Sequence, residues 1–213
     1  MRLLSINVSK PKPISHEGKI IYTGIFKEPV SGTVMLREMN IDGDGQGDLK
    51  VHGGTYKAIY GYPIEHYKHW QETLGRDDLS FGQFGENLTV EGMLEDEVHI
   101  GDIFKIGSTV RLQITQPRVP CFKLGHKMGS AEFPKIFLQS KRVGFYFRVI
   151  EEGEITAHDE IERVDVSSDP MSVTDILSLR YFDTNNHEGI TKAIRQPALS
   201  PSWKKDFNRL LNL

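Results

Sequence analysis

Cys121, the only cysteine of the chain, lies between two cationic residues, Arg118 and Lys123, and directly follows Pro120. Nearby positive charge favours the thiolate over the thiol, and the thiolate is the form that attacks electrophiles or binds a soft metal. Proline fixes φ and removes a backbone donor, so the chain approaches the sulfur with little freedom. A lone cysteine is more often a small, buried, apolar side chain. The cations and the prolines shift the interpretation toward a functional thiol.

A glycine pair, Gly53-Gly54, follows two residues that can bind an anion, Lys50 and His52. Adjacent glycines let a backbone approach a ligand closely or adopt positive φ. Backbone N–H groups beside a cation form an anion site. A β-turn with a surface histidine explains the same residues equally well, so the local pattern leaves both interpretations open.

Glu86 and Asn87 join a polar turn to an apolar run. Asn87 can hydrogen-bond neighbouring backbone groups and so shape the turn. The functional alternative places Glu86 or Asn87 at the mouth of a pocket, and the local sequence does not decide between the two.

Other motifs are excluded by their details. Residues 42–53 imitate the first half of a calcium loop, but Gly53 stands where a bidentate glutamate belongs. His66 and His69 lack the residue order of a zinc protease motif. With no acidic or sulfur partner near them in the sequence, we predict that they lie on a solvated helix face. The chain also has no nucleophile elbow, P-loop or dinucleotide fingerprint.

The composition, with 38% hydrophobic and 26% charged residues, is typical of a soluble globular protein. The formal net charge of −3 offers no basic excess for a nucleic-acid polymer as partner. No apolar stretch approaches the ~18 to 20 residues that a membrane helix needs. One cysteine allows no internal disulfide, which fits a reducing compartment. We therefore expect a cytoplasmic protein without a membrane partner.

Short apolar segments separated by glycine and proline dominate the first three quarters of the chain. We predict a loop over 9–19, a turn at Gly153, and helices over 63–74 and 132–140. Strands are predicted over 3–8, 20–26, 34–39, 57–60, 87–90, 103–106, 110–115, 143–150 and 160–166. Many short strands with few helices favour a mostly antiparallel barrel or sandwich.

The last part of the chain predicts three helices and no strand. A capping box begins at Ser172, a second helix covers 187–194, and Ser200-Pro201 supplies an N-cap and a first-turn proline for the third. Three helices are too few for a stable core of their own. They must dock on the β part or on a second copy of the chain, so a homodimer seam that includes Trp203 stays open.

Four motifs, in this order, resemble the MOSC domain, which is named for the C-terminal region of molybdenum cofactor sulfurases. The motifs are Asp48-x-x-x-His52-Gly53-Gly54-x-x-Lys57-Ala58-Ile59-Tyr60, Phe84-Gly85-Glu86-Asn87-Leu88, Gly101-Asp102-x-Phe104-x-Ile106-Gly107 and Gln113-x-Thr115-Gln116-Pro117-Arg118-x-Pro120-Cys121-x-Lys123-Leu124. The helical tail resembles the appendage of the bacterial YiiM-type members. The expected organisation is a MOSC β-barrel domain over 1–166 and a three-helix appendage over 167–213.

The resemblance implies an open pocket that ends at Cys121. In relatives the matching cysteine ligates the molybdenum of a bound molybdopterin cofactor, so Cys121 is the expected metal ligand. Arg118 offers a bidentate fork to the cofactor phosphate, and lysines offer point charges. The implied cofactor-binding residues are Lys50, His52, Gly53, Gly54, Asn87, Thr115, Arg118, Cys121 and Lys123.

The resemblance also implies an activity, which is the reduction of N-hydroxylated compounds such as N-hydroxylated purine bases. Electrons would come from a separate flavin reductase, and His52 and Glu86 are candidate proton donors beside Cys121. Two alternatives stay open: a molybdopterin cofactor carrier, and a sulfur carrier or transferase that uses a Cys121 persulfide. Pyridoxal phosphate is not expected, because the chain has no room for a desulfurase domain.

Overall fold

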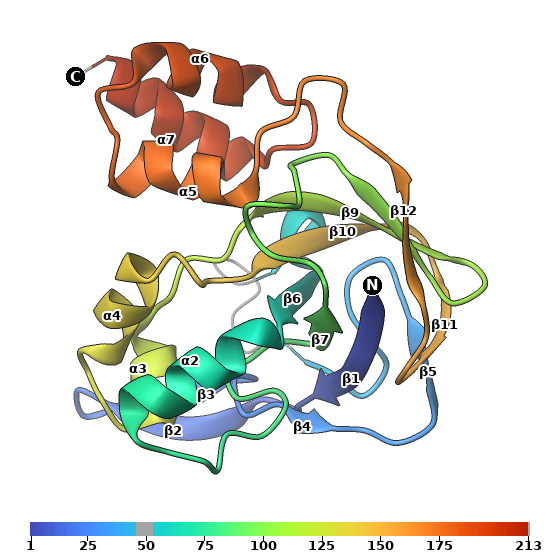
Figure 1. Cartoon of the computed structure of the whole chain (residues 1–213). Coiled ribbons are helices and arrows are strands. Elements are labelled where there is room, and N and C mark those ends of the chain that lie inside the picture. The colour runs from blue at the N-terminus through green and yellow to red at the C-terminus, as the bar shows by residue number, and fades with distance from the viewer. Residues whose placement is uncertain (46–52, 213) are drawn as a thin grey trace.

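An eight-stranded sheet forms the centre of the computed structural model, which describes residues 1–45 and 53–212. The strand order is β12-β8-β9-β10-β6-β7-β1-β4, and the described pairings are antiparallel except for the parallel pair β6 and β7. Its strands are β1 (Arg2–Val8), β4 (Glu28–Pro29), β6 (Ile59–Pro63), β7 (Leu88–Glu91), β8 (Ile103–Ile106), β9 (Val110–Pro117), β10 (Phe145–Glu151) and β12 (Ile161–Asp165). The predicted mostly β architecture is confirmed (Figure 1).

The two ends of this sheet approach each other near the N-terminus. Arg2 forms an isolated antiparallel bridge with Glu160, and the Leu3 N–H donates to the Asp159 carbonyl at 3.0 Å. Because β12 begins at Ile161, this contact brings β1 beside the start of β12. No continuous ladder joins β1 and β12 among the described residues, so a closed barrel stays a prediction.

Two small ribbons accompany the large sheet. One pairs β5 (Thr33–Leu36) with β11 (Gly153–Thr156), and the other pairs β2 (Lys12–His16) with β3 (Lys19–Thr23). The predicted loop over 9–19 and the predicted turn at Gly153 are therefore wrong. Pro13 obscured β2 in the sequence, and a proline is tolerated there because a two-stranded ribbon leaves one edge unpaired. The predicted strand over 20–26 ends at Thr23.

Six α-helices and one short 3-10 helix complete the described structure: η1 (Thr55–Lys57), α2 (Glu65–Leu74), α3 (Phe122–Met128), α4 (Phe133–Gln139), α5 (Val173–Tyr181), α6 (His187–Arg195) and α7 (Pro201–Leu211). Helices α2, α3 and α4 lie at one end of the molecule, and α5, α6 and α7 form a separate group at the other (Figure 1). The predicted strand over 57–60 is half wrong, because η1 occupies its start and β6 begins at Ile59.

Aromatic side chains pack α2 and α4 against β6. Trp70 of α2 lies 5.3 Å from the Phe137 ring of α4 in a stacked arrangement, and its indole N–H donates to the Tyr62 hydroxyl at 2.6 Å. Phe84 and Phe133 lie in the same fully buried cluster. Burying one such ring contributes on the order of 1.5 to 3 kcal/mol. This cluster is the support behind the site described below.

The predicted start signals of α5 and α7 are confirmed. At α5 the Ser172 hydroxyl accepts from the Asp175 N–H at 3.0 Å, and the Asp175 carboxylate accepts from the Ser172 N–H at 2.9 Å. Ser200 caps α7, with Pro201 in its first turn. Trp203 and Phe207 are buried in one apolar core that runs from the sheet into these helices. The helices thus dock on the β part of their own chain.

Candidate functional site

The segment that carries the cysteine is the link between a central strand and a helix. β9 ends at Pro117 and α3 begins at Phe122, so the intervening residues turn out of the sheet. The Arg118 N–H donates to the Gly144 carbonyl at 3.1 Å, which ties the link to the start of β10. Gly144 has φ 69°, and a Cβ there would meet the Gly61 carbonyl oxygen at 2.4 Å, so glycine is required for this close approach.

Cys121 lies partly exposed at the start of α3, on the wall of a pocket. Helix α3 was not predicted, because its seven residues follow two prolines and include a glycine. Four predicted site residues line this pocket together: Asn87, Arg118, Cys121 and Lys123. The other lining residues are Thr23, Gly24, Ile25, Lys27, Asp44, Gly45, Lys57, Tyr60, Phe84, Gly85, Val119 and Tyr146.

A row of three side chains crosses the sheet beside Cys121. Gln116 of β9 pairs with Tyr146 of β10, and Tyr146 pairs with Tyr60 of β6. Directly opposed residues of antiparallel strands share one face of the sheet, so the three lie side by side. Burial raises the pKa of Tyr146, the nearby Arg118 guanidinium opposes that rise, and Cys121 adds to it. The Tyr146 hydroxyl therefore holds its proton at neutral pH close to Cys121.

Arg118 is held by aromatic rings and has spare hydrogen-bonding capacity. Its Cζ lies 5.4 Å from the Tyr60 ring centroid and 5.3 Å from that of Phe137. The residue is 5% exposed, and its Nη1 has no hydrogen-bond partner among the described residues. Leaving a buried N–H group without a hydrogen-bond partner costs free energy, and the cost is largest for a charged group. Arg118 is thus positioned to receive an anion.

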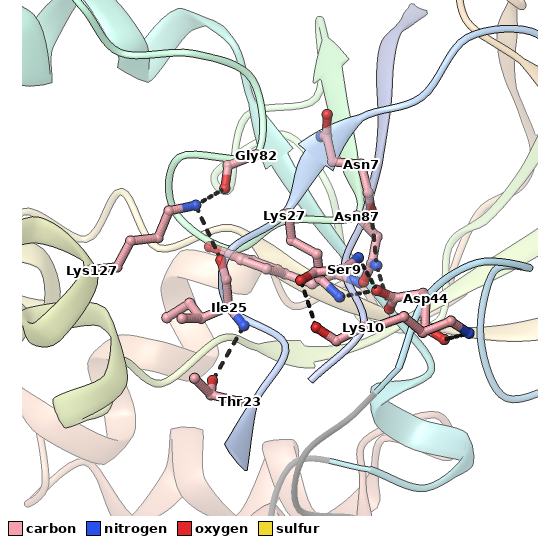
Figure 2. A network of polar contacts seen from close by, with 11 residues as sticks. Asn7, Ser9, Lys10, Thr23, Ile25, Lys27, Asp44, Gly82, Asn87 and Lys127 are labelled. Carbon is pink, nitrogen blue, oxygen red and sulfur yellow. Dashed lines mark hydrogen bonds and ion pairs between the residues drawn. The ribbon is translucent and has the colours of Figure 1, made fainter. Parts of the chain in front are cut away.

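Asp44 is the centre of a polar network that includes two further residues of the pocket lining, Lys27 and Asn87 (Figure 2). It is 6% exposed and forms a buried ion pair with Lys27. The same carboxylate accepts from the Ser9 N–H at 2.8 Å and from the Asn87 amide at 2.9 Å. Asp44 offsets Lys27, and the described lining also carries the positive charges of Arg118 and Lys123.

Glu86, predicted as a catalytic residue, lies behind the pocket wall. It is fully buried and accepts from the N–H groups of Gly82 at 2.8 Å and Phe84 at 3.0 Å. The hydroxyls of Tyr67 and Thr89 also donate to it. Burial raises the pKa of Glu86 despite these donors. These contacts fix the turn that carries Gly85 and Asn87, and Glu86 is not among the residues that line the pocket. Its catalytic role stays a prediction.

The remaining predicted residues lie outside the pocket lining or outside the described residues. Thr115 is fully buried and its hydroxyl contacts the carbonyls of Tyr56 at 2.7 Å and Tyr146 at 3.0 Å, so it joins η1 to β10. Gly54 has the positive φ that its sequence allowed and, with Gly53, leads into η1. Lys50 and His52 lie outside the described residues, and their roles stay predictions.

The buried ammonium of Lys127 should make the stability of the folded protein depend measurably on pH. Its ammonium donates to the carbonyls of Gly82 at 2.6 Å and Ile25 at 3.1 Å, and burial lowers its pKa from 10.5 to about 8 (Figure 2). Between these values the unfolded chain binds a proton that the folded chain lacks, so folding gains stability as the pH rises. We expect the stability of the wild type relative to Lys127→Met to increase from about pH 8 to about pH 10.5.

Urea unfolding midpoints on both sides of this pH window measure that difference. Lys135→Met, at an exposed position of α4, controls for the loss of one positive charge. A constant difference between the wild type and Lys127→Met across the window would show that Lys127 does not titrate there.

One of the two helix histidines corrects a prediction, whereas His69 is partly exposed. His66 is 7% exposed and its Nε2 lies 2.6 Å from Glu95 Oε2, so it does not lie on a solvated face. Glu95 also accepts from the Gly144 N–H at 2.7 Å. The acidic partner was missed because it lies 29 residues away in the sequence. No group of three His, Cys, Asp or Glu side chains in the described parts of the chain could hold a metal by itself.

Sequence reasoning did not single out several pocket residues. Lys57 and Tyr60 stand in the first quoted motif, so their motif positions were a usable signal. Asp44 belongs to the segment whose calcium-loop interpretation was excluded, and its spacing there gave no indication of the buried ion pair with Lys27. Lys27 and Tyr146 had no local signal, because their place in the site depends on strand pairing and on a contact 17 residues away.

Comparison with protein families gives two matches that together span this arrangement. Residues 48–162 match the MOSC domain, and residues 171–212 match the YiiM-like 3-alpha helix domain. This chain belongs to the MOSC-domain family. The MOSC match contains both Cys121 and Arg118, and the second match contains α5, α6 and α7.

Individual proteins agree with the MOSC assignment. YflK of Bacillus subtilis (strain 168) is 43% identical over 96% of this chain and 92% of its own length. The crystal structure of YiiM from Geobacillus stearothermophilus superposes with a TM-score of 0.84 at 35% identity and covers 98% of each chain. A protein of Gibberella moniliformis named "Reductase" is 34% identical over 75% of this chain, which is 28% of its own length.

The MOSC family is associated with molybdenum cofactor binding, and the residues of this pocket fit such a group. A thiol and a buried guanidinium nitrogen without a partner face one space. The positive charges of Arg118 and Lys123 suit a phosphate, and a thiolate suits a soft metal centre. No helix among residues 1–45 and 53–212 is long and apolar enough to cross a membrane.

Proposed function

We propose that this protein binds a molybdenum cofactor in the Cys121 pocket and reduces N-hydroxylated compounds. The observation that carries the proposal is the buried Arg118 Nη1 without a partner, beside the cysteine of a MOSC-domain chain. The relative named as a reductase supports the reaction class. When bound, the cofactor supplies the two-electron redox chemistry, and the chain binds, orients and shields it.

The described residues divide this work between them. Cys121 would hold the metal, and Arg118 with Lys123 would hold the phosphate. The Asp44 network keeps its part of the pocket lining in place, because it joins Lys27 and Asn87 in one buried set of contacts. These residues come from different segments of the chain, so the fold has to form before the cofactor can bind.

A proton is needed at the site because the reaction consumes two. R–NH–OH takes up two electrons and two protons, its N–O bond breaks, and R–NH₂ and water form. The Tyr146 hydroxyl is the described group best placed to hold such a proton, since it lines the pocket beside Cys121 and burial raises its pKa. His52 stays a candidate outside the described residues. A separate flavin reductase is the proposed electron donor.

The proposal is tested by two measurements on one preparation. Protein purified from a host that makes the cofactor should contain molybdenum and pterin close to one per chain. With a flavin reductase and NADH, it should convert benzamidoxime to benzamidine. Cofactor without turnover would favour the carrier alternative, and a persulfide on Cys121 without molybdenum would favour sulfur transfer. Absence of molybdenum, pterin and turnover would overturn the proposal.

A further inference from the structure

The residues that lead into β10 hold Arg118 from two directions. The Gly144 carbonyl accepts from the Arg118 N–H at 3.1 Å, and the Val143 carbonyl accepts from the Tyr60 hydroxyl at 2.8 Å. The Tyr60 ring lies against the guanidinium, with Arg118 Cζ 5.4 Å from its centroid. Two neighbouring carbonyls therefore fix both the backbone of Arg118 and one of the rings that contact its charged group.

Glu95 fixes this segment from outside the pocket. It is 4% exposed, and its Oε1 accepts from the Gly144 N–H at 2.7 Å. Gly144 is thus hydrogen-bonded on both sides, to Glu95 through its N–H and to Arg118 through its carbonyl. Glycine has the greatest backbone freedom of all residues, so such bonds are what hold it in one conformation. The carboxylate that holds Gly144 therefore also holds the carbonyl to which Arg118 is tied.

His66 of α2 holds Glu95 in its turn. Its Nε2 lies 2.6 Å from Glu95 Oε2, and the residue is 7% exposed. The two oxygens of one carboxylate therefore join α2 to Gly144. Neither His66 nor Glu95 is among the residues that line the Cys121 pocket, so any effect they have on the pocket passes through Gly144 and Arg118.

We propose that Glu95, oriented by His66, is a positioning residue that places Arg118 for the cofactor phosphate. Recognition of a phosphate by a guanidinium depends on geometry, because two N–H groups have to meet two oxygens. A binding side chain keeps such a geometry only when the hydrogen bonds behind it lock its place. This inference rests on the proposed function, since it takes Arg118 as the residue that holds the phosphate.

The sign of one substitution separates positioning from simple electrostatics. Replacing Glu95 by an uncharged side chain removes a negative charge near the anion, which by Coulomb's law alone strengthens phosphate binding. Positioning predicts the opposite for Glu95→Ala, because the Gly144 N–H loses its acceptor. Glu95→Gln keeps an acceptor for Gly144, and its NH₂ group can donate to the Nε2 of a neutral His66. Positioning therefore predicts that Glu95→Gln binds phosphate at least as tightly as the wild type.

Titration of the cofactor-free full chain with inorganic phosphate measures this effect without turnover. The Arg118 amide signal in a proton–nitrogen correlation spectrum reports both phosphate binding and the hydrogen bond to Gly144. We expect Glu95→Ala to weaken phosphate binding about three- to tenfold, the worth of one hydrogen bond, and to speed hydrogen exchange at the Arg118 amide. Glu97→Gln removes a negative charge from an exposed position of the same segment, so it should change neither quantity.

His66 provides an independent variant. His66→Leu takes one partner from Glu95 and leaves its hydrogen bond to Gly144 possible, so phosphate binding should weaken less than in Glu95→Ala. Because both residues act through one chain of contacts, the double variant should bind phosphate no more weakly than Glu95→Ala alone. A double variant in which the two losses add would overturn the role of His66.

Arg118→Gln separates failure of this inference from failure of the proposed function. If phosphate binding weakens in Arg118→Gln but is unchanged or stronger in Glu95→Ala, the positioning role is wrong while Arg118 keeps the phosphate. If Arg118→Gln binds phosphate like the wild type, the phosphate site of the proposed function is wrong and the inference fails with it. Should Glu95→Ala not fold, as judged by thermal unfolding, unchanged phosphate binding in His66→Leu overturns the positioning role instead.

Discussion

Cys121→Ala should lose nearly all bound molybdenum while keeping the fold. The side chain is partly exposed and belongs to no disulfide, so its removal leaves the core described above intact. In the proposed function it is the ligand that this chain gives to the metal, and no described cluster of other side chains could replace it. Metal analysis and pterin fluorescence of the wild type and the variant, purified in parallel from a cofactor-producing host, measure the loss. We expect a decrease of more than about tenfold in molybdenum per chain, since a thiolate is the soft ligand in this wall.

Cys121→Ser is the matched control, because it keeps the size of the side chain and replaces the soft sulfur by a hard oxygen. Its molybdenum content should also fall, and the thermal unfolding midpoint of both variants should stay near that of the wild type. Full molybdenum content and full reductase activity in Cys121→Ala would remove the cysteine from the site. Lost persulfide with retained molybdenum would instead indicate a sulfur-carrying role.

The elements that the sequence predicts well are those whose signals are local. The end of the helix predicted over 63–74 is confirmed because Gly75, with φ 62°, ends it as expected. Its predicted start is wrong, because Pro63 is the last residue of β6 and α2 begins at Glu65. The capping box at Ser172 is confirmed because its two hydrogen bonds join residues three apart. The strand over 103–106 agrees with β8 at both ends, since glycines bound it on either side.

Features that depend on distant contacts were not predictable from one sequence. His66 has the spacing of a surface histidine, and only the fold brings Glu95 to it. Glu86 stands in a family motif and is therefore a natural catalytic candidate, yet four donors from its own turn, from α2 and from β7 enclose it. Membership in a motif indicates that a residue is important. It does not show whether that residue contacts a ligand itself or positions another residue that contacts the ligand.

The candidate site shows the same division. The Arg118-to-Lys123 segment was evident from charge and proline, whereas the residues opposite it required three-dimensional pairing. Tyr146 reaches the pocket because its strand pairs with β6 on one side and β9 on the other. A register shift between Tyr146 and Phe147 interrupts the β9 pairing at this point, so alternation along the strand would not have placed the tyrosine.

Asp44→Asn should produce the largest loss of stability among the described pocket residues. Asp44 accepts from Lys27, the Ser9 N–H and Asn87, and the Lys27 and Asp44 side chains are both almost fully buried. The asparagine side chain keeps the shape of Asp44 and removes its negative charge. Its NH₂ group then faces groups that are themselves hydrogen-bond donors. Burial lowers the pKa of the Lys27 ammonium, and the negative charge of Asp44 opposes that decrease. Asp44→Asn removes this charge and leaves a buried cation without its partner. Breaking such a pair on one side costs about 3 to 5 kcal/mol.

The same loop contains a second aspartate that serves as the control for Asp44→Asn. Asp42, two residues earlier, pairs with Arg37 through two contacts at 2.6 and 2.9 Å, but both side chains lie exposed to solvent. Asp42→Asn should therefore leave the urea midpoint close to that of the wild type, because water screens such a pair. The double variant Lys27→Met with Asp44→Asn should recover part of the loss, since it removes the stranded charge. If Asp44→Asn and Asp42→Asn unfold at the same urea concentration, the buried ion pair between Lys27 and Asp44 does not stabilise the lining of the Cys121 pocket.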